Sequence, residues 1–528
     1  MSLLQSVVIA LVMALLLSEN LGYGHLQISR PVFAAPIIGL CLGDLQTGLI
    51  VGGTVELMFM GVFPVGGSVP PNAQFAGMMS TVLAISSGGN AEVGITLAYP
   101  IGVFAQFILL LDYNINLIFI HRADRLVEKN NIRGINSSLY LCLLCMFLCW
   151  FVSSFAGAYL GSAWVEGLYN ALPEWFRTGL NIAGGIMPAM GMAMLLKMMD
   201  FKKFWAFLMI GYVLTAYLNM SILAIAILSC GVAVAVYTLS KDSNSNPDSL
   251  SSLNSNQSNT VEKVLTDKEF KAINLRSMLV GACLNYERYL GLGYGYAMLP
   301  ALEKLYKGED LKDAANCHME FYNTHPWMHN LILGVTVALE EQKALGQPIS
   351  EDAISSTKAA LMGPTAGFGD SFFKGVVVTI TGAFAASLAI DGNPLAPIVF
   401  IIPNILVMLF VRLYGFKYGY KYGTKLIIQM QKSNIIQKFV SGSTIVGMMV
   451  TAGLITNYVK ITLTTTLNLS GAEIVLNDLI DSVLPKLLPY LIVFFFYWIM
   501  KKNEKHGIYI TLLLSFVIGI GGVALGIL

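Results

Sequence analysis

The chain has 528 residues, of which 55% are hydrophobic and 12% charged, and its mean hydropathy is +0.67. A soluble protein carries about twice that charged fraction, so the composition excludes a soluble binding module and indicates a surface facing lipid. The formal net charge is +1, which gives no attraction to nucleic acid. We therefore expect an all-α polytopic membrane protein.

The N-terminal apolar segment, residues 3–17, could pass for a signal peptide but lacks a basic n-region. We expect it to form the first membrane helix or half-helix. Many later apolar runs are shorter than the roughly 20 residues of a span, or are interrupted by Gly, Pro or an acid. Interrupted runs are typical of transporters, in which irregular backbone lines a protected cavity.

One polar segment divides the chain. Residues 241–260, KDSNSNPDSLSSLNSNQSNT, have too few apolar side chains to offset the entropy of folding, which predicts a disordered linker. Its position predicts two membrane domains, at 1–240 and 261–528. Directly after it, residues 262–275 predict an amphipathic helix capped by Thr266, which suits an interfacial or docking position better than a span.

Two interrupted segments of the first domain carry polar side chains. Residues 39–61 are rich in glycine and contain two acids, Asp44 and Glu56. An acid at membrane depth costs a few kcal/mol, so it needs a reason to be there. We interpret Asp44 as the cap of a half-helix and Glu56 as a substrate or cavity residue. Residues 63–77 contain Gly-Gly and Pro-Pro pairs that break a helix, and Asn72 then suits an N-cap, a ligand contact or both.

The first polar block of the second domain is LNYERYLGLGY, residues 284–294. On a helix, Asn285, Arg288 and Tyr289 would share one face. That face could hydrogen-bond a sugar or position a phosphoryl group, and the alternative for Arg288 is an ion pair that joins helices. GLGYGY does not match the dinucleotide fingerprint.

The second block, residues 317–330, combines the side-chain types that bind carbohydrates. A carboxylate, an amide, a hydroxyl and an indole fall on one face of a predicted helix: Glu320, Asn323, Thr324 and Trp327. Pro326 disfavours helix at the residue before it, so we expect the helix to break there.

Two sets of residues resemble metal ligands by spacing alone. His325 and His329 are four residues apart, but a zinc motif would need a regular helix across Pro326. Three cysteines within one apolar run, at positions 142, 145 and 149, lack a second Cys pair or a His. We interpret them as small packing residues and predict no metal site.

The third block ends one apolar run and interrupts the next. Glu340 and Glu341 either lie at a solvated helix end or have a function inside the bundle. In residues 361–373, clustered glycines and a proline surround Asp370, which predicts an irregular loop or re-entrant hairpin.

These blocks resemble a known family. GLCLGDLQTGLIVGGTVE (39–56), NIAGGI and the PPNA block resemble the C component of mannose/fructose/sorbose-family phosphotransferase permeases. LNYERYLGLGY, MEFYNTHPW, LGVTVALEEQ and LMGPTAGFGD resemble the D component. Several long blocks in the same order account for nearly the whole chain outside the linker. The sequence thus resembles a fusion of components that are usually separate chains.

The resemblance implies a fold and an activity. It implies two helical membrane domains with broken or re-entrant helices, each with a mobile core and a scaffold, and a homotrimer of the fused chain in the bacterial plasma membrane. A sugar would be phosphorylated as it crosses, by a cytoplasmic B component that carries a phosphohistidine and receives phosphate from an A component. This chain would then be the membrane part of the phosphotransferase, without a cofactor and without a phosphohistidine of its own.

The candidate sugar contacts come from both domains: Glu56, Asn72, Asn285, Arg288, Glu320, Asn323 and Asp370. Glu56 or Glu320 could accept the proton of the sugar hydroxyl. Position 72 is Asn where mannose-type members have Asp, so the sugar could equally be a ketose, an amino sugar or another hexose. Two alternatives stay open: an ion-coupled sugar transporter that uses the same acids, and an intramembrane metalloenzyme built on His318, His325 and His329.

Overall fold

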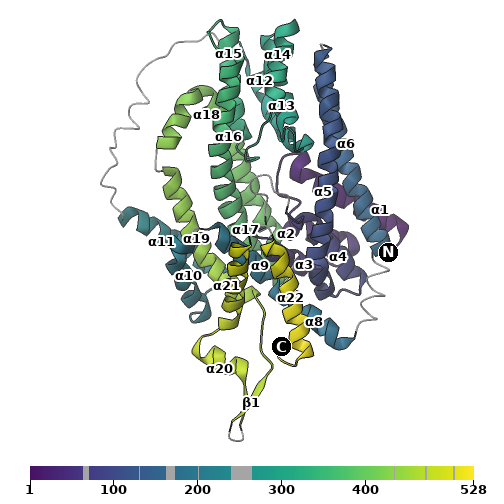
Figure 1. Ribbon diagram of the computed structural model, residues 1–528, viewed down its shortest axis with the longest axis vertical. Helices are drawn as coiled ribbons and strands as arrows, with labels where there is room; N and C mark the ends of the chain where they lie inside the picture. Colours follow the sequence, from purple (N-terminus) through teal and green to yellow (C-terminus); the bar gives the residue numbers. More distant parts are fainter. Residues whose placement is uncertain are drawn as a thin grey trace.

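The computed structural model describes residues 1–62, 70–129, 131–161, 173–199, 201–239, 264–432, 435–469, 472–503 and 506–528. The predicted linker lies outside these residues. We call residues 1–239 the N-terminal half and residues 264–528 the C-terminal half. Apart from its connecting segments and one short hairpin, the described chain is helical, as the composition predicts (Figure 1).

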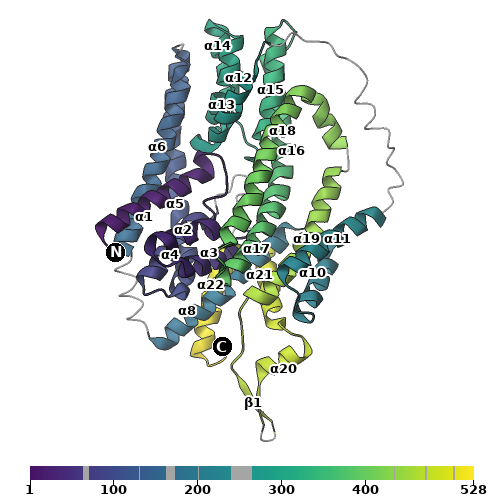
Figure 2. The ribbon, with the colours of Figure 1, turned by 180° about the vertical axis from the view of Figure 1, so that it is seen from behind.

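Helices of the N-terminal half are short and broken around two long ones. They are α1 (Leu3–Gly22), α2 (Pro31–Leu42), α3 (Leu45–Met58), α4 (Ala73–Ser86), α5 (Ala91–Glu128), α6 (Arg133–Ala156) with the π-turn η1 (Gly157–Gly161), α8 (Glu174–Ile186), α9 (Pro188–Met198), α10 (Phe201–Ala216) and α11 (Ile222–Leu239). Figure 2 shows α2, α3 and α4 gathered beside α5, and α3 packs against a helix of the other half, α17 (Thr379–Ile390).

The C-terminal half has the same mixture of long and interrupted helices. Besides α17 it contains α12 (Asp267–Arg276), the 3-10 turn η4 (Ser277–Cys283), α13 (Gly291–Leu305), α14 (Gly308–Met319), α15 (His329–Ala344), α16 (Glu351–Gly369), the π-helix η5 (Asp370–Val378), α18 (Ala396–Lys432), α19 (Ile435–Tyr458), α20 (Leu476–Val483), α21 (Leu487–Lys502) and α22 (Gly507–Ala524). The hairpin pairs β1 (Thr466–Leu469) antiparallel to β2 (Ala472–Val475), an element that the sequence analysis did not predict.

Several helical stretches are long and apolar enough to cross a membrane. Among the described residues these are Leu3–Gly22, Ala91–Glu128, Arg133–Gly161, Glu351–Ile390 and Ala396–Tyr422. A sixth span is formed if α20 and α21, bent by 86° at their junction, count together. The chain is thus a multi-pass membrane protein, and the N-terminal apolar segment is a full helix of 20 residues.

The break between α2 and α3 follows from local sequence. Gly43 ends α2 in the left-handed conformation (φ 83°), which glycine adopts without steric cost. Asp44 then caps α3 by accepting from the backbone N–H of Thr47 at 3.0 Å, as predicted. A Cβ on Gly48 would lie 2.8 Å from the carbonyl oxygen of Ala35, so the two short helices pack backbone to backbone.

The predicted loop at 361–373 is wrong. α16 runs through Pro364 and continues without a break into η5 and α17. π-Helical segments are rare overall and are frequent at functional sites. The predicted helix after the linker is confirmed: Thr266 and Glu269 form a capping box at the start of α12, and these hydrogen bonds lower the pKa of the Glu269 carboxyl.

The two halves share one hydrophobic core. Val55 of α3, Ala386 of α17 and Ile445 of α19 belong to the same buried cluster. The backbones approach closely where α10 crosses α19, since a Cβ on Gly211 would lie 2.5 Å from the carbonyl oxygen of Met449. This packing places segments from both halves around a common centre.

Candidate functional site

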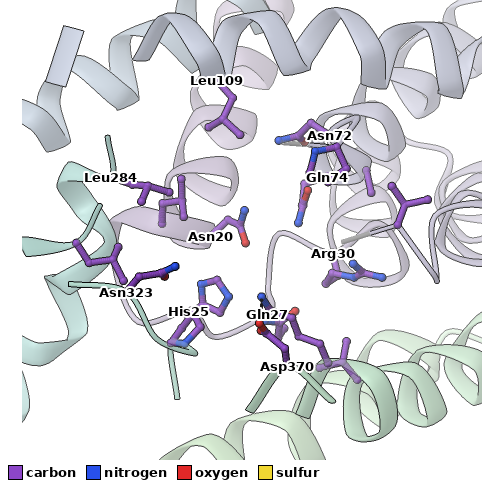
Figure 3. A pocket seen from close by; sticks show the side chains of 18 of the residues that line it. Asn20, His25, Gln27, Arg30, Asn72, Gln74, Leu109, Leu284, Asn323 and Asp370 are labelled. Carbon is purple, nitrogen blue, oxygen red and sulfur yellow. Dashed lines mark ion pairs between the residues drawn. The ribbon is translucent and has the colours of Figure 1, made fainter. Parts of the chain in front are cut away.

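A cavity of about 310 Å³ lies between the two halves (Figure 3). The N-terminal half contributes the strap, which we define as residues 23–30 between α1 and α2, and the start of α4. The C-terminal half contributes the loop 284–290, the segment 323–326 between α14 and α15, and η5. Both halves are therefore needed to enclose it.

Asn72 lines this cavity at the start of α4. Its side-chain oxygen accepts from the backbone N–H of Phe75 at 2.8 Å, which makes it the predicted N-cap. Its backbone N–H donates to the carbonyl of Gly102 at 2.9 Å. The cap uses the amide oxygen, and within the described residues no hydrogen bond of the amide nitrogen accompanies it, so the nitrogen can serve a ligand in the cavity.

Asn285 also lines the cavity, but not from a helix. Residues 285–289 form a tight turn, in which the Asn285 side chain accepts from the backbone N–H of Glu287 and Arg288 at 3.0 and 2.8 Å. Its amide nitrogen donates to the carbonyl of Tyr289, whose φ is +52°. The predicted helical face is wrong because the Asn side chain replaces the helical hydrogen bonds with an Asx-type turn.

The segment 320–328 is irregular, which corrects the second predicted helical face. α14 ends at Met319, well before the break expected at His325. Asn323 and Thr324 line the cavity, whereas the buried Trp327 donates its indole N–H to the carbonyl of His25 at 3.1 Å. The predicted carbohydrate set is therefore divided, and only its amide and hydroxyl members face the cavity.

Asp370 lines the cavity at the first position of η5. It forms an ion pair with Lys374, one helical turn later, at 3.1 Å, and Lys374 lines the cavity as well. The two side chains are 32% and 20% exposed, so the pair remains accessible from the cavity.

Glu56 lies one layer behind the cavity wall. It is fully buried and pairs with Arg30, whose Nε donates to the carboxylate at 3.0 Å, and the backbone N–H of Val32 donates to the same group at 3.4 Å. Arg30 lines the cavity, and Glu56 does not. Glu56 thus acts on the cavity indirectly, by fixing the position of the Arg30 guanidinium.

Arg288 and Glu320 lie elsewhere, in a second and more polar hollow of about 640 Å³. Arg288 pairs with Asp124 of α5 at 2.8 Å, as in the ion-pair alternative. Glu320 has a 57% exposed side chain and accepts from the hydroxyl of Ser355 at 2.6 Å. The structure therefore separates these two residues from the other candidates.

Sequence reasoning missed the strap. His25, Gln27 and Arg30 all line the cavity from it, and Figure 3 shows their side chains around one opening with Asn20 and Asp370. Two of the three have left-handed backbone conformations, with φ of +55° for His25 and +69° for Gln27. The available signal was polarity: HLQISR separates two apolar runs, and its arginine directly precedes the second.

Glu340 and Glu341 are both buried, so the solvated-end alternative is wrong. Glu340 accepts from Tyr306 at 2.7 Å and contacts the imidazole of His318 at 2.8 Å. Glu341 accepts from the backbone N–H of Val264 and Leu265, at 2.9 and 2.8 Å. These acids fix the interior and the start of the C-terminal half, away from the cavity.

His325 and His329 do not lie on one helix, as a helical metal-binding motif would require. His329 begins α15 and His325 precedes it in irregular backbone, where its Nδ1 accepts from the backbone N–H of Trp327 at 3.2 Å. Among the described residues, Asp112, Cys145 and Cys149 bring their donor atoms within 4.8 Å of one another. This group lies between α5 and α6, outside the cavity.

The comparisons with known proteins divide at the same place as the composition. Residues 3–237 match the family described as the PTS system sorbose-specific IIC component, and residues 264–528 match the PTS system mannose/fructose/sorbose family IID component. Each component has its own relatives.

The N-terminal half is 34% identical over 206 residues to the N-acetylgalactosamine permease IIC component 1 of Escherichia coli K12, covering 39% of this chain and 77% of that protein. The C-terminal half is 37% identical over 278 residues to the mannose-specific EIID component of the same strain, covering 51% of this chain and 97% of that protein. A chain in the cryo-EM structure of a mannose transporter with microcin E492 is 35% identical, with a TM-score of 0.30, and covers 51% of this chain and 99% of that one.

The matched regions account for nearly all described residues of both halves. Together with the multi-pass helices, they place the protein in the inner membrane of a bacterium. The chain belongs to the mannose/fructose/sorbose family of phosphotransferase-system permeases and joins a IIC and a IID component in one polypeptide.

Proposed function

We propose that the cavity between the halves binds a sugar, which the protein carries across the membrane while a cytoplasmic phosphohistidine protein phosphorylates it. The observation that supports this most directly is that four of the predicted sugar contacts, contributed by both components, line the same cavity. These residues are Asn72, Asn285, Asn323 and Asp370. A ligand held there would contact both components at once.

The lining suits a hydroxyl-rich, uncharged solute. Carboxamides recur around the cavity and can both donate to and accept from sugar hydroxyls. They belong to Asn20, Gln27, Asn72, Gln74 and Asn323. Tyr113 and Tyr286 add aromatic surface for the apolar faces of a sugar ring. The charged groups are present as the pairs Arg30–Glu56 and Lys374–Asp370, so the wall has no excess charge.

Phosphoryl transfer from a phosphohistidine depends on positioning and on neutralising the charge of the transferred group. Arg30 is the cavity cation that is most firmly placed, because Glu56 holds it. Glu56 does not line the cavity, so it could receive the hydroxyl proton only if Arg30 moved aside and the sugar reached it. Glu320 could serve only if the sugar reached the second hollow, since a general base must lie within hydrogen-bond distance of its proton.

The partners that we propose come from membership of the family. The phosphoryl donor is a cytoplasmic IIB protein, charged by a IIA protein, and the assembly is a homotrimer of the fused chain in the lipid bilayer. The names of the relatives leave the substrate between a hexose such as mannose and an amino sugar such as N-acetylgalactosamine. We propose that the substrate is a neutral hexose or N-acetylated amino sugar.

Uptake by membrane vesicles tests the proposal. With the cognate cytoplasmic proteins and phosphoenolpyruvate inside, vesicles should accumulate sugar phosphate, and an uncoupler should not stop them. Asn323→Ala should lower uptake, whereas Asn114→Ala, an exposed asparagine of α5 outside the cavity, serves as the matched control. Uptake that persists without phosphoenolpyruvate but collapses with an uncoupler would support the ion-coupled alternative instead.

A further inference from the structure

The strap does not hold its shape by local contacts alone. Gly24, His25 and Gln27 all have positive φ, at 90°, 55° and 69°. Left-handed backbone is costly for a residue with a Cβ, so two of these three positions need outside support. Glu19, at the end of α1, supplies part of it by accepting from the backbone N–H of Gln27 and Ser29, at 3.0 and 3.3 Å.

Further support comes from the C-terminal half, through hydrogen bonds to two adjacent strap residues, Gly24 and His25. Arg412 of α18 donates from Nη1 to the carbonyl of Gly24 at 2.9 Å. Trp327 donates to the carbonyl of His25, and the backbone N–H of Gly24 donates to the carbonyl of Met278 at 2.8 Å. The wall of the cavity contributed by one component is thus fastened by the other.

Arg412 has an unusual environment for a guanidinium. It is 4% exposed within an apolar span, and no carboxylate of the described residues lies within ion-pair distance of it. Its Nη2 donates to the carbonyl of Ser277 at 2.6 Å. An unpaired charge at membrane depth is costly, so such a residue usually has a structural or functional role.

The two carbonyls held by Arg412 belong to neighbouring segments, since the backbone N–H of Gly24 also donates to the carbonyl of Met278 at 2.8 Å. Gly24 is part of the strap, and Ser277 begins η4, which leads directly into the cavity loop 284–290. One planar guanidinium with a fixed fork of donors therefore holds the strap against η4. Lysine has three donors on a flexible stem, so it could reach both carbonyls but would not fix their geometry.

We infer that Arg412 is a positioning residue for the sugar site: from the IID component, it holds the strap of the IIC component at the distance at which His25, Gln27 and Arg30 meet the sugar. This rests on the proposed function. It also means that the IIC component alone does not form a competent wall, so joining the two components in one chain maintains the pairing on which the site depends.

Hydrogen–deuterium exchange of the purified full chain tests the positioning without any sugar. In Arg412→Gln, amides of residues 23–30 should exchange at least about tenfold faster, because a charge-assisted hydrogen bond is lost. Amides of α13 should change less than about twofold. Arg276→Gln is the matched control: its Nη1 donates to the carbonyl of Tyr296 within its own half and does not touch the strap. Equal exchange of the strap in Arg412→Gln and wild type would overturn the inference.

Sugar phosphorylation supplies the functional readout. Arg412→Gln should raise KM by about tenfold with kcat within about threefold, the result of losing ground-state binding, and Arg412→Lys should lie between the variant and wild type. If Arg412→Gln does not fold, Trp327→Phe removes one strap bond and should raise KM by about threefold. Unchanged KM in folded variants would contradict the inference. A wild-type protein that phosphorylates no sugar would instead refute the proposed function and leave the exchange result standing.

Discussion

Removing the carboxylate behind Arg30 tests how the charged pair serves the cavity. Glu56→Gln keeps the size of the side chain but leaves the Arg30 guanidinium, 11% exposed, without its counter-charge. Breaking a buried pair by removing one partner costs about 3–5 kcal/mol, because the other charge stays buried. We therefore expect a clear fall in the free energy of unfolding, and a loss of phosphorylation larger than the loss of sugar binding.

The double variant separates stability from function. Combining Arg30→Met with Glu56→Met removes both charges, and replacing a buried pair by apolar side chains is often neutral for stability. The double variant should recover most of the lost stability and none of the phosphorylation, since the cavity then lacks its held cation. Thr54→Ser serves as the control, because Thr54 lies on α3 but does not line the cavity. Gly53 of the same helix is unsuitable, because it packs against Ala386.

The assays are denaturant unfolding of the purified protein and vesicle phosphorylation at saturating sugar. Wild-type turnover in Glu56→Gln would refute the reasoning, because the pair would then be irrelevant to transfer. Recovery of phosphorylation in the double variant would show that Arg30 contributes packing alone.

Three further outcomes are expected. Asn72→Ser retains a capping oxygen and should change the unfolding free energy by less than about 0.5 kcal/mol, whereas Asn72→Ala should cost about 1 kcal/mol; both should raise the KM for sugar, and an unchanged KM would remove Asn72 from the site. Asp370→Asn leaves Lys374 unpaired beside the sugar, so KM should rise in uptake assays while stability falls by less than about 1 kcal/mol, and a large loss of stability with normal KM would contradict this. Treatment with a zinc chelator should leave phosphorylation unchanged, because the Asp112 group lies outside the cavity; inhibition that added zinc reverses would contradict this.

The parts of the fold that were predictable depend on local signals. Asp44 and Asn72 begin α3 and α4 because each side chain accepts from a backbone N–H three residues later, an interaction that is visible in the sequence. Thr266 does the same for α12. Family resemblance and composition together predicted a multi-pass helical protein in two components.

The turn at 285–289 could not be predicted in this way. The spacing of its polar residues fits a helix, but the backbone at the turn also pairs with a later segment, since the N–H of Tyr322 donates to the carbonyl of Arg288 at 3.2 Å. This long-range bond acts together with the local hydrogen bonds of Asn285, and the sequence does not display it. Glu340 was ambiguous for the same reason, since its partners come from elsewhere in the chain: His318 lies on α14 and Tyr306 directly follows α13.

The site was only partly predictable because its geometry is assembled between halves. Asn323 and Asp370 were recognised by residue type, and both line the cavity. Arg288 and Glu320 have equally suitable chemistry but face the second hollow. The strap residue His25 was missed because its position depends on a long-range hydrogen bond, which the indole of Trp327 donates to its carbonyl.

A structure of the protein with its sugar bound would show whether the cavity between the halves is the sugar site. We predict density for the sugar between the strap and η5, within hydrogen-bond distance of Asn72 and Asn323. Density in the second hollow, against Arg288 and Glu320, would contradict it.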